Sequence, residues 1–124
     1  MKQLVGVVIF LMLALTAWRQ WERHAPPADM SRSEMRALAA GVRAEEVVMY
    51  TTTECGYCVQ AKRWLDANGF AFTECNMSVD ARCQTEFQSY QAQGTPFLVI
   101  HRGKKPHQMH DGFDEDEFVK ALKA

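Results

Sequence analysis

The sequence predicts an α/β domain with a mixed β-sheet flanked by helices, preceded by an N-terminal membrane helix. From residue 46 onward, short apolar β-branched runs alternate with helical patterns, which is typical of a sheet covered on both faces. Before that point the chain contains an uncharged apolar run, Leu4 to Trp18. The length of 124 residues, with 48% apolar and 23% charged residues, fits one globular domain.

The first apolar segment, LVGVVIFLMLALTAW, leaves two alternatives open. As a helix it covers roughly 22 Å, short of the ~30 Å hydrocarbon core, so its length lies between a signal-peptide core and a full span. The candidate residue pairs at positions −3 and −1 of a cleavage site are Leu15/Ala17 and Arg23/Ala25, each with one large residue. We therefore predict an uncleaved signal-anchor over residues 1–21, in the membrane through residues 4–18, with a cleaved signal as the alternative.

The charges that flank this segment bear on its orientation. Lys2 and the free amine favour a cytoplasmic N-terminus, whereas Arg19, Arg23 and His24 argue the other way. A short tail followed by a large domain is the usual signal-anchor arrangement, which predicts a membrane-anchored domain in the periplasm. The cytoplasmic face is the alternative.

Residues 22–45 are predicted to be a linker with one short helix. Pro26-Pro27 stiffens the linker. Ser31 and Glu34 form a capping-box pattern that opens a helix ending near Gly41.

The remaining residues, 46–124, form the predicted domain. Its elements follow the order β-α-β-α-β-β-α, which gives a four-stranded sheet. The predicted elements are strand 47–52, helix 58–68, strand 70–75, helix 79–90, strand 97–100, strand 107–110 and helix 115–122, the last capped by Asp114.

Cys55 and Cys58 form a C-G-Y-C motif at the start of the first helix of this domain. A zinc site usually needs a second matching pair, and Cys75 and Cys83 are poorly spaced for that, so no metal site is predicted. If the helix begins just after Cys55, its free N–H groups and dipole stabilise the Cys55 thiolate as nucleophile. Cys58, one turn on, is then placed to resolve a mixed disulfide.

Several other residues are candidates for contacts with a substrate. Tyr57 either shapes the entrance to the cysteines or is an exposed turn residue. Pro96 precedes the third strand, and from the residues alone the Thr95-Pro96 bond is either trans or a cis bond that turns Thr95 toward an extended substrate. Gly112 and Asp114 are the other predicted substrate contacts, and Asp114 or Glu115 could meet an amino group.

These features together resemble the glutaredoxin branch of the thioredoxin superfamily. The resemblance rests on C-G-Y-C at a helix start, T-P before the third strand and the G-F-D turn at Gly112 into the last helix, and it covers roughly residues 46–124. It implies a thioredoxin fold, a cis Thr95-Pro96 bond beside the cysteines and thiol–disulfide exchange.

The chain departs from that family at two places that bear on glutathione. Thr52 stands where the family commonly has a Lys or Arg, and Asp111-Gly112 stands where it tends to have Gly-Gly. Thr52 removes a positive charge, and Asp111 adds a negative charge, where a glutathione carboxylate would bind. Glutathione is therefore a possible co-substrate, and no tightly bound cofactor is expected.

Cys75 and Cys83 have two interpretations. In an oxidising compartment they either form a structural disulfide or pack as two buried thiols.

We therefore predict a thiol–disulfide oxidoreductase that works through a mixed disulfide. Its partners would be a thiol- or disulfide-bearing protein or glutathione, and a second redox partner that resets the pair. The alternative is a non-catalytic binding module that holds a client protein or a metal ion. The one basic cluster, Arg102-Gly103-Lys104-Lys105, is predicted to be a solvated turn, and no nucleic-acid partner is expected.

Overall fold

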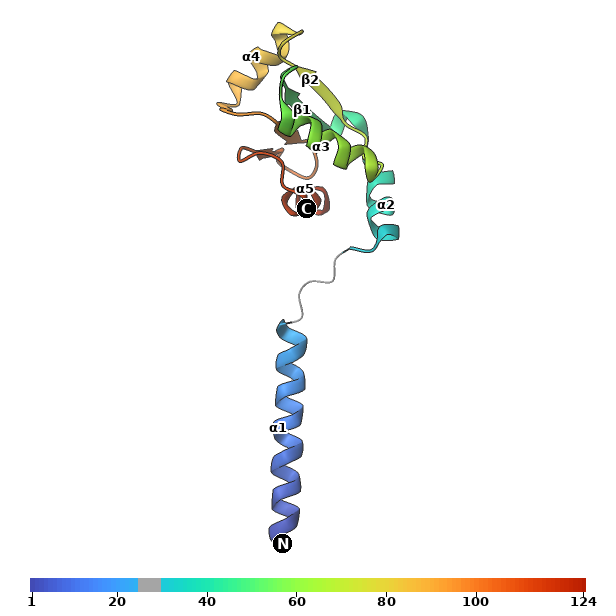
Figure 1. The fold of residues 1–124 in the computed structure, drawn as a ribbon, viewed down its shortest axis with the longest axis vertical. Helices are drawn as coiled ribbons and strands as arrows, with labels where there is room; N and C mark the ends of the chain where they lie inside the picture. Colours follow the sequence, from blue (N-terminus) through green and yellow to red (C-terminus); the bar gives the residue numbers. More distant parts are fainter. Residues whose placement is uncertain (25–29) are drawn as a thin grey trace. The chain divides into compact units, whose positions relative to one another are not determined.

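The computed structural model describes residues 1–24 and 30–124, with side chains for residues 1–19 and 30–124. Ala25 of the candidate cleavage site and the predicted stiff Pro26-Pro27 lie outside the described residues. The chain divides into two compact units, Met1–Met30 and Ser31–Ala124 (Figure 1). The finer division into anchor, linker and domain stays a prediction.

The first unit contains one helix, α1 (Lys2–His24). Within the described residues, α1 is the single helix long and apolar enough to cross a membrane, over Lys2–Arg19 with a mean hydropathy of 1.5. A signal sequence near an N-terminus has the same length and composition. The helix is therefore compatible with either an anchor or a signal, and both alternatives stay open.

The second unit contains a four-stranded mixed sheet flanked by helices, as the sequence predicts. The sheet order is β2-β1-β3-β4, with β1 and β2 parallel and the other two neighbouring pairs antiparallel. The elements in chain order are α2 (Arg32–Ala40), the 3-10 turn η1 (Ala44–Glu46), β1 (Val47–Thr51), α3 (Gly56–Ala67), β2 (Thr73–Asn76), α4 (Ala81–Ser89), β3 (Phe97–Ile100), β4 (His107–Met109) and α5 (Glu115–Lys123).

Alternation along β1 divides the buried side chains between the two faces of the sheet. Val47 and Met49 pack on one face with residues of α2, α3 and α5. Val48 and Tyr50 pack on the other face with residues of α4. Helices thus cover both faces of the sheet, and β1 and β3, its two central strands, lie between the helices of the two faces.

Several helix ends follow from local side-chain hydrogen bonds. The predicted capping box opens α2, where Glu34 N donates to Ser31 Oγ at 3.2 Å and Ser31 N donates to Glu34 Oε2 at 2.9 Å. The predicted Asp114 cap opens α5. Helix α3 ends at Ala67 with Asn68 as its C-cap, and Gly69 follows with φ of +78°, a conformation that favours glycine.

Two elements begin later than predicted. The predicted strand at residue 70 begins at Thr73, because Phe70 N donates to Leu65 O at 2.9 Å and so remains in the turn that ends α3. The predicted helix at Val79 begins at Ala81, because the Asp80 carboxylate caps it by accepting from Arg82 N at 2.9 Å.

Candidate active site

The two cysteines of the C-G-Y-C motif lie at the N-terminus of α3, in the loop that follows β1. Cys55 is the N-cap residue, and its Sγ accepts a hydrogen bond from Cys58 N at 3.1 Å. The two residues are joined as a disulfide, with 5.2 Å between their Cα atoms. The structure therefore represents the oxidised form of this pair.

The two sulfur-bearing residues differ in their access to solvent. Cys58 is only 1% exposed, whereas Cys55 is partly exposed. A thiol or thiolate from another molecule can thus reach Cys55 and not Cys58. When the disulfide is reduced, the N–H groups and dipole of the α3 N-terminus stabilise a thiolate on Cys55. Exposed Glu54 is the adjacent residue and adds negative charge next to that thiolate.

Tyr57, Thr95, Pro96 and Gly112, four of the predicted substrate contacts, line one cavity of about 550 Å³. The Thr95-Pro96 peptide bond is cis, and Pro96 is buried. Residues from α3, the loop before β3 and the turn after β4 together form the wall. Besides the four predicted contacts, the cavity is lined by Gln60, Ala61, Trp64, Gly94, His110, Asp111, Phe113 and Glu115.

Asp114, Thr52 and the two cysteines of the motif are not among the residues that line this cavity. Tyr57, between the two cysteines in the sequence, is the residue of the motif that lines it. Asp114 Oδ1 accepts a hydrogen bond from Glu117 N at 2.8 Å, so its carboxylate is engaged as the cap of α5. Glu115, the next residue, lines the cavity instead. Thr52 lines a separate, smaller cavity with residues of α4. A substrate contact from Asp114 stays a prediction.

Sequence reasoning missed three aromatic or histidine residues of the wall. Trp64 follows Tyr57 by seven residues, so both project from the same face of α3. Its ring packs against Phe113, with 5.4 Å between ring centroids, which fixes one side of the cavity. His110 follows β4, with its ring centroid 5.0 Å from that of Phe97 and its Nε2 2.8 Å from Gln108 Oε1. The helical spacing signalled Trp64; the positions of Phe113 and His110 depend on the packing of distant elements.

Residues 47–104 match the family model for glutaredoxin, a span that contains all four cysteines and the cis proline. The domain is glutaredoxin-like. Its fold is that of the thioredoxin superfamily: a point mutant of the thioredoxin-like protein BC3987 superposes with a TM-score of 0.50 at 22% identity, over 61% of this chain and 97% of that chain.

A curated relative is "Global transcriptional regulator Spx 2" of Bacillus anthracis, which is 29% identical over 82 residues. The match covers 61% of this chain and 63% of the relative, so the chain spans less than two thirds of the relative's length. A wheat glutaredoxin structure matches at 17% identity and a TM-score of 0.41, over 61% of this chain and 72% of that one.

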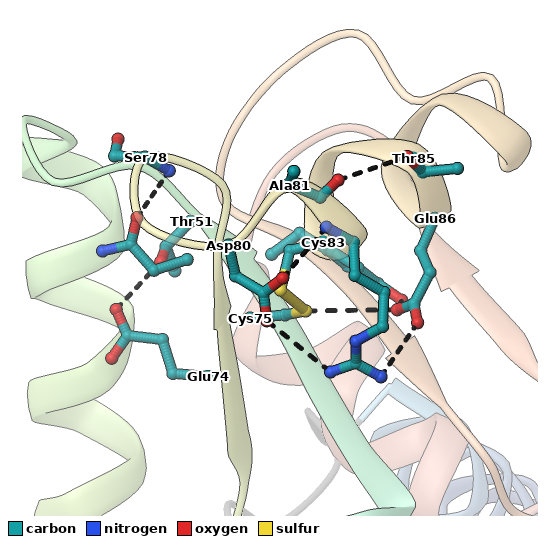
Figure 2. The surroundings of a disulfide bond; sticks show 12 residues. Thr51, Glu74, Cys75, Ser78, Asp80, Ala81, Cys83, Thr85 and Glu86 are labelled. Carbon is teal, nitrogen blue, oxygen red and sulfur yellow. Dashed lines mark hydrogen bonds and ion pairs between the residues drawn. A yellow bond between two sulfur atoms is a disulfide. The ribbon is translucent and has the colours of Figure 1, made fainter.

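The glutaredoxin-like domain contains a second disulfide, between Cys75 on β2 and Cys83 on α4 (Figure 2). Their exposed fractions are 4% and 2%. Figure 2 shows the Glu86 side chain directed toward this disulfide, with its Oε2 4.0 Å from the Cys75 Sγ. A carboxylate so close disfavours a thiolate on Cys75, in contrast to the helix terminus that favours one on Cys55.

Glu86 is itself held by two other side chains. Tyr50 donates its hydroxyl hydrogen to Glu86 Oε2 at 2.8 Å, and Arg82 lies 3.3 Å from Glu86 Oε1. Burial raises the pKa of Tyr50 far above its ordinary value, and the hydrogen bond to Glu86 raises it further. The phenol is therefore a hydrogen-bond donor at every physiological pH.

Proposed function

We propose that the glutaredoxin-like domain is a thiol–disulfide oxidoreductase that uses Cys55 as the attacking residue and Cys58 as the resolving residue. The observation that carries this proposal is the asymmetry of the pair at the start of α3. Cys55 is partly exposed and caps the helix, whereas Cys58 is buried and donates its backbone N–H to the Cys55 sulfur.

The reaction starting from the reduced protein has two exchange steps. The Cys55 thiolate attacks one sulfur of a substrate disulfide, the substrate S–S bond breaks, and the first substrate thiolate leaves and takes up a proton. The Cys58 sulfur, as a thiolate, then attacks Cys55 Sγ of the mixed disulfide and releases the second substrate thiol. The substrate gains two electrons and two protons, and the protein is left with the Cys55–Cys58 disulfide. The reverse sequence oxidises a substrate dithiol.

The substrates in this proposal are proteins that bear a thiol or a disulfide, with glutathione as a possible co-substrate. Thr95, next to the cis bond and in the cavity wall, would offer its main chain to an extended substrate. A separate thiol or disulfide carrier would reset the pair, as the stoichiometry of the exchange requires. The domain would lie on the periplasmic side of a membrane, anchored by α1.

Single cysteine variants of the full chain in mild detergent test this function. Reduced wild-type protein should reduce 2-hydroxyethyl disulfide, a small neutral substrate, in one turnover. Cys55→Ser should slow the reaction by roughly a hundredfold or more, because it removes the nucleophile. Cys58→Ser should instead accumulate a mixed disulfide on Cys55, visible by mass spectrometry without reductant. Turnover in Cys55→Ser at the wild-type rate would refute the proposal.

The alternative function is a binding module without turnover, and the match to a protein named as a transcriptional regulator favours considering it. In that case client capture would survive Cys55→Ser/Cys58→Ser, and neither single variant would alter a disulfide substrate. Affinity capture with the double variant, run beside the turnover assay, separates the two functions.

A further inference from the structure

The charged groups in the wall of the 550 Å³ cavity, here called the groove, are predominantly acidic. Asp111 and Glu115 both line it, and no Lys or Arg is among its lining residues. Both carboxylates are exposed, and neither forms an ion pair or side-chain hydrogen bond with any residue that the structure describes. They are therefore available to a ligand.

The neighbouring cations are either engaged or outside the wall. On α3, Lys62 pairs with Glu74 at 3.0 Å, and Arg63 does not line the groove. His107, which precedes the turn of Asp111, lies 2.8 Å from Glu117. The one side chain of the wall that could carry positive charge is His110, hydrogen-bonded to Gln108. The groove consequently presents net negative charge to whatever enters it at neutral pH.

The rest of the wall suits a polypeptide. Tyr57 is 74% exposed at the rim, and Trp64 and Phe113 supply an apolar side. Exposed aromatic residues next to polar groups are typical of surfaces that bind other proteins.

We propose that the groove selects polypeptide segments that carry Lys or Arg close to the reacting cysteine, and that it disfavours segments carrying carboxylates there. This proposal rests on the oxidoreductase function above and names the class of its substrate. Asp111 and Glu115 attract the cationic side chains, while like charge repels an acidic segment. Their contribution is in recognition, and the exchange at Cys55 keeps the electron and proton balance already described.

The test compares short peptides that differ only in the residues flanking one cysteine, which are Lys, Gln or Glu. Each cysteine is joined as a mixed disulfide to 2-mercaptoethanol. Single-turnover reduction by the reduced full chain is quenched with acid and quantified by mass spectrometry. Each rate is divided by the rate at which free 2-mercaptoethanol reduces the same peptide disulfide, which removes the intrinsic effect of charge on the leaving thiol.

At low ionic strength the normalised rate for the Lys peptide should exceed that for the Glu peptide by roughly five- to tenfold. The ratio should fall toward one at about 0.5 M salt, where exposed charges are screened. Asp111→Asn/Glu115→Gln should lower the Lys rate, raise the Glu rate and bring the ratio to within roughly twofold of one. The matched control Asp66→Asn/Glu45→Gln makes the same change in net charge outside the groove and should keep the wild-type ratio.

Two results would overturn the proposal: equal normalised rates for the three peptides in wild type, or a preference for Lys that survives in Asp111→Asn/Glu115→Gln. If the peptides all react through Cys55 without charge preference, selectivity is refuted and the oxidoreductase function stands. If no peptide reacts and Cys55→Ser behaves as wild type, the oxidoreductase function itself is wrong.

Discussion

Tyr50 and Glu86 form a part-buried hydrogen bond beside the second disulfide of the domain. Tyr50 is 3% exposed, and its hydroxyl hydrogen is donated to Glu86. The same carboxylate approaches Cys75 (Figure 2). It also pairs with Arg82. Removing the hydroxyl would leave Glu86 half-buried with one strong partner instead of two.

Tyr50→Phe should lower the free energy of unfolding by about 1–2 kcal/mol at neutral pH, since a buried hydrogen bond to a charged group is lost. The raised pKa of Tyr50 sets the pH dependence. Above about pH 10 an unfolded tyrosine loses its proton while the folded one keeps it, so the stabilisation is present below that pH and is lost as pH rises.

The measurement is denaturant unfolding of the full chain in detergent, followed by near-ultraviolet circular dichroism. Between about pH 9 and pH 11 the free energy of unfolding of the wild type should fall more steeply than that of Tyr50→Phe. The difference between the two proteins should shrink by up to about 1 kcal/mol. Parallel curves for the two proteins would show that Tyr50 ionises normally. Other tyrosines and lysines titrate in both proteins and cancel in the difference.

At the scale of elements, the Cys75–Cys83 disulfide joins β2 to α4 across a sequence separation of 8 residues. Replacing both cysteines by alanine should lower the free energy of unfolding by about 2–3 kcal/mol, because the open loop regains entropy when the chain unfolds. The rate of Cys55 with 2-hydroxyethyl disulfide should stay at the wild-type value. Unchanged stability in Cys75→Ala/Cys83→Ala would mean that the bridge does not constrain this loop.

Pattern and capping chemistry were sufficient to predict the type and order of the elements from β1 onward. The helix predicted over 58–68 begins two residues earlier, at Gly56, so that Cys55 is its N-cap and the stated condition for a stabilised Cys55 thiolate is met. The start of β2 could not be predicted correctly: Phe70 is buried in the core and looks like a strand residue, although its N–H belongs to the turn of α3. An alternating apolar pattern predicts which side chains are buried. The backbone hydrogen bonds decide whether such a residue belongs to a strand or to a neighbouring turn.

The residues of the candidate site that belong to local motifs could be predicted from the sequence, and those brought together by packing could not. The cysteines form a short-range motif that their spacing identified. For Thr95-Pro96 the residues alone left cis and trans open, and the resemblance to the glutaredoxin family implied the cis bond. Trp64 could have been found from its helical spacing to Tyr57. His110 and Phe113 line the groove because elements distant in the sequence pack together, and no local pattern encodes that packing. Asp114 was predicted correctly as the cap of α5, and that engagement makes Glu115 the more available acidic side chain.

At the scale of the whole molecule, the chain combines an apolar helix, α1, with a redox domain that has two disulfides. Disulfides persist outside the cytoplasm, where glutathione and thioredoxin do not keep thiols reduced. The buried Cys75–Cys83 pair has no role in the proposed exchange, so its bond would be useful only where it stays oxidised. The second disulfide thus supports the periplasmic placement proposed above.

Expression of the full chain in a bacterium tests this placement. We expect the chain to stay in the membrane pellet after an alkaline carbonate wash, and its mass to show that α1 is retained. Protease added to spheroplasts should digest residues 31–124, whereas protease added to intact cells should not. A fusion of alkaline phosphatase after Ala124 should be active, since that enzyme needs its disulfides to form. Release by carbonate with loss of α1 would instead identify a cleaved signal. Protection in spheroplasts with an inactive fusion would place the domain in the cytoplasm, where Cys75 and Cys83 should be trapped as free thiols.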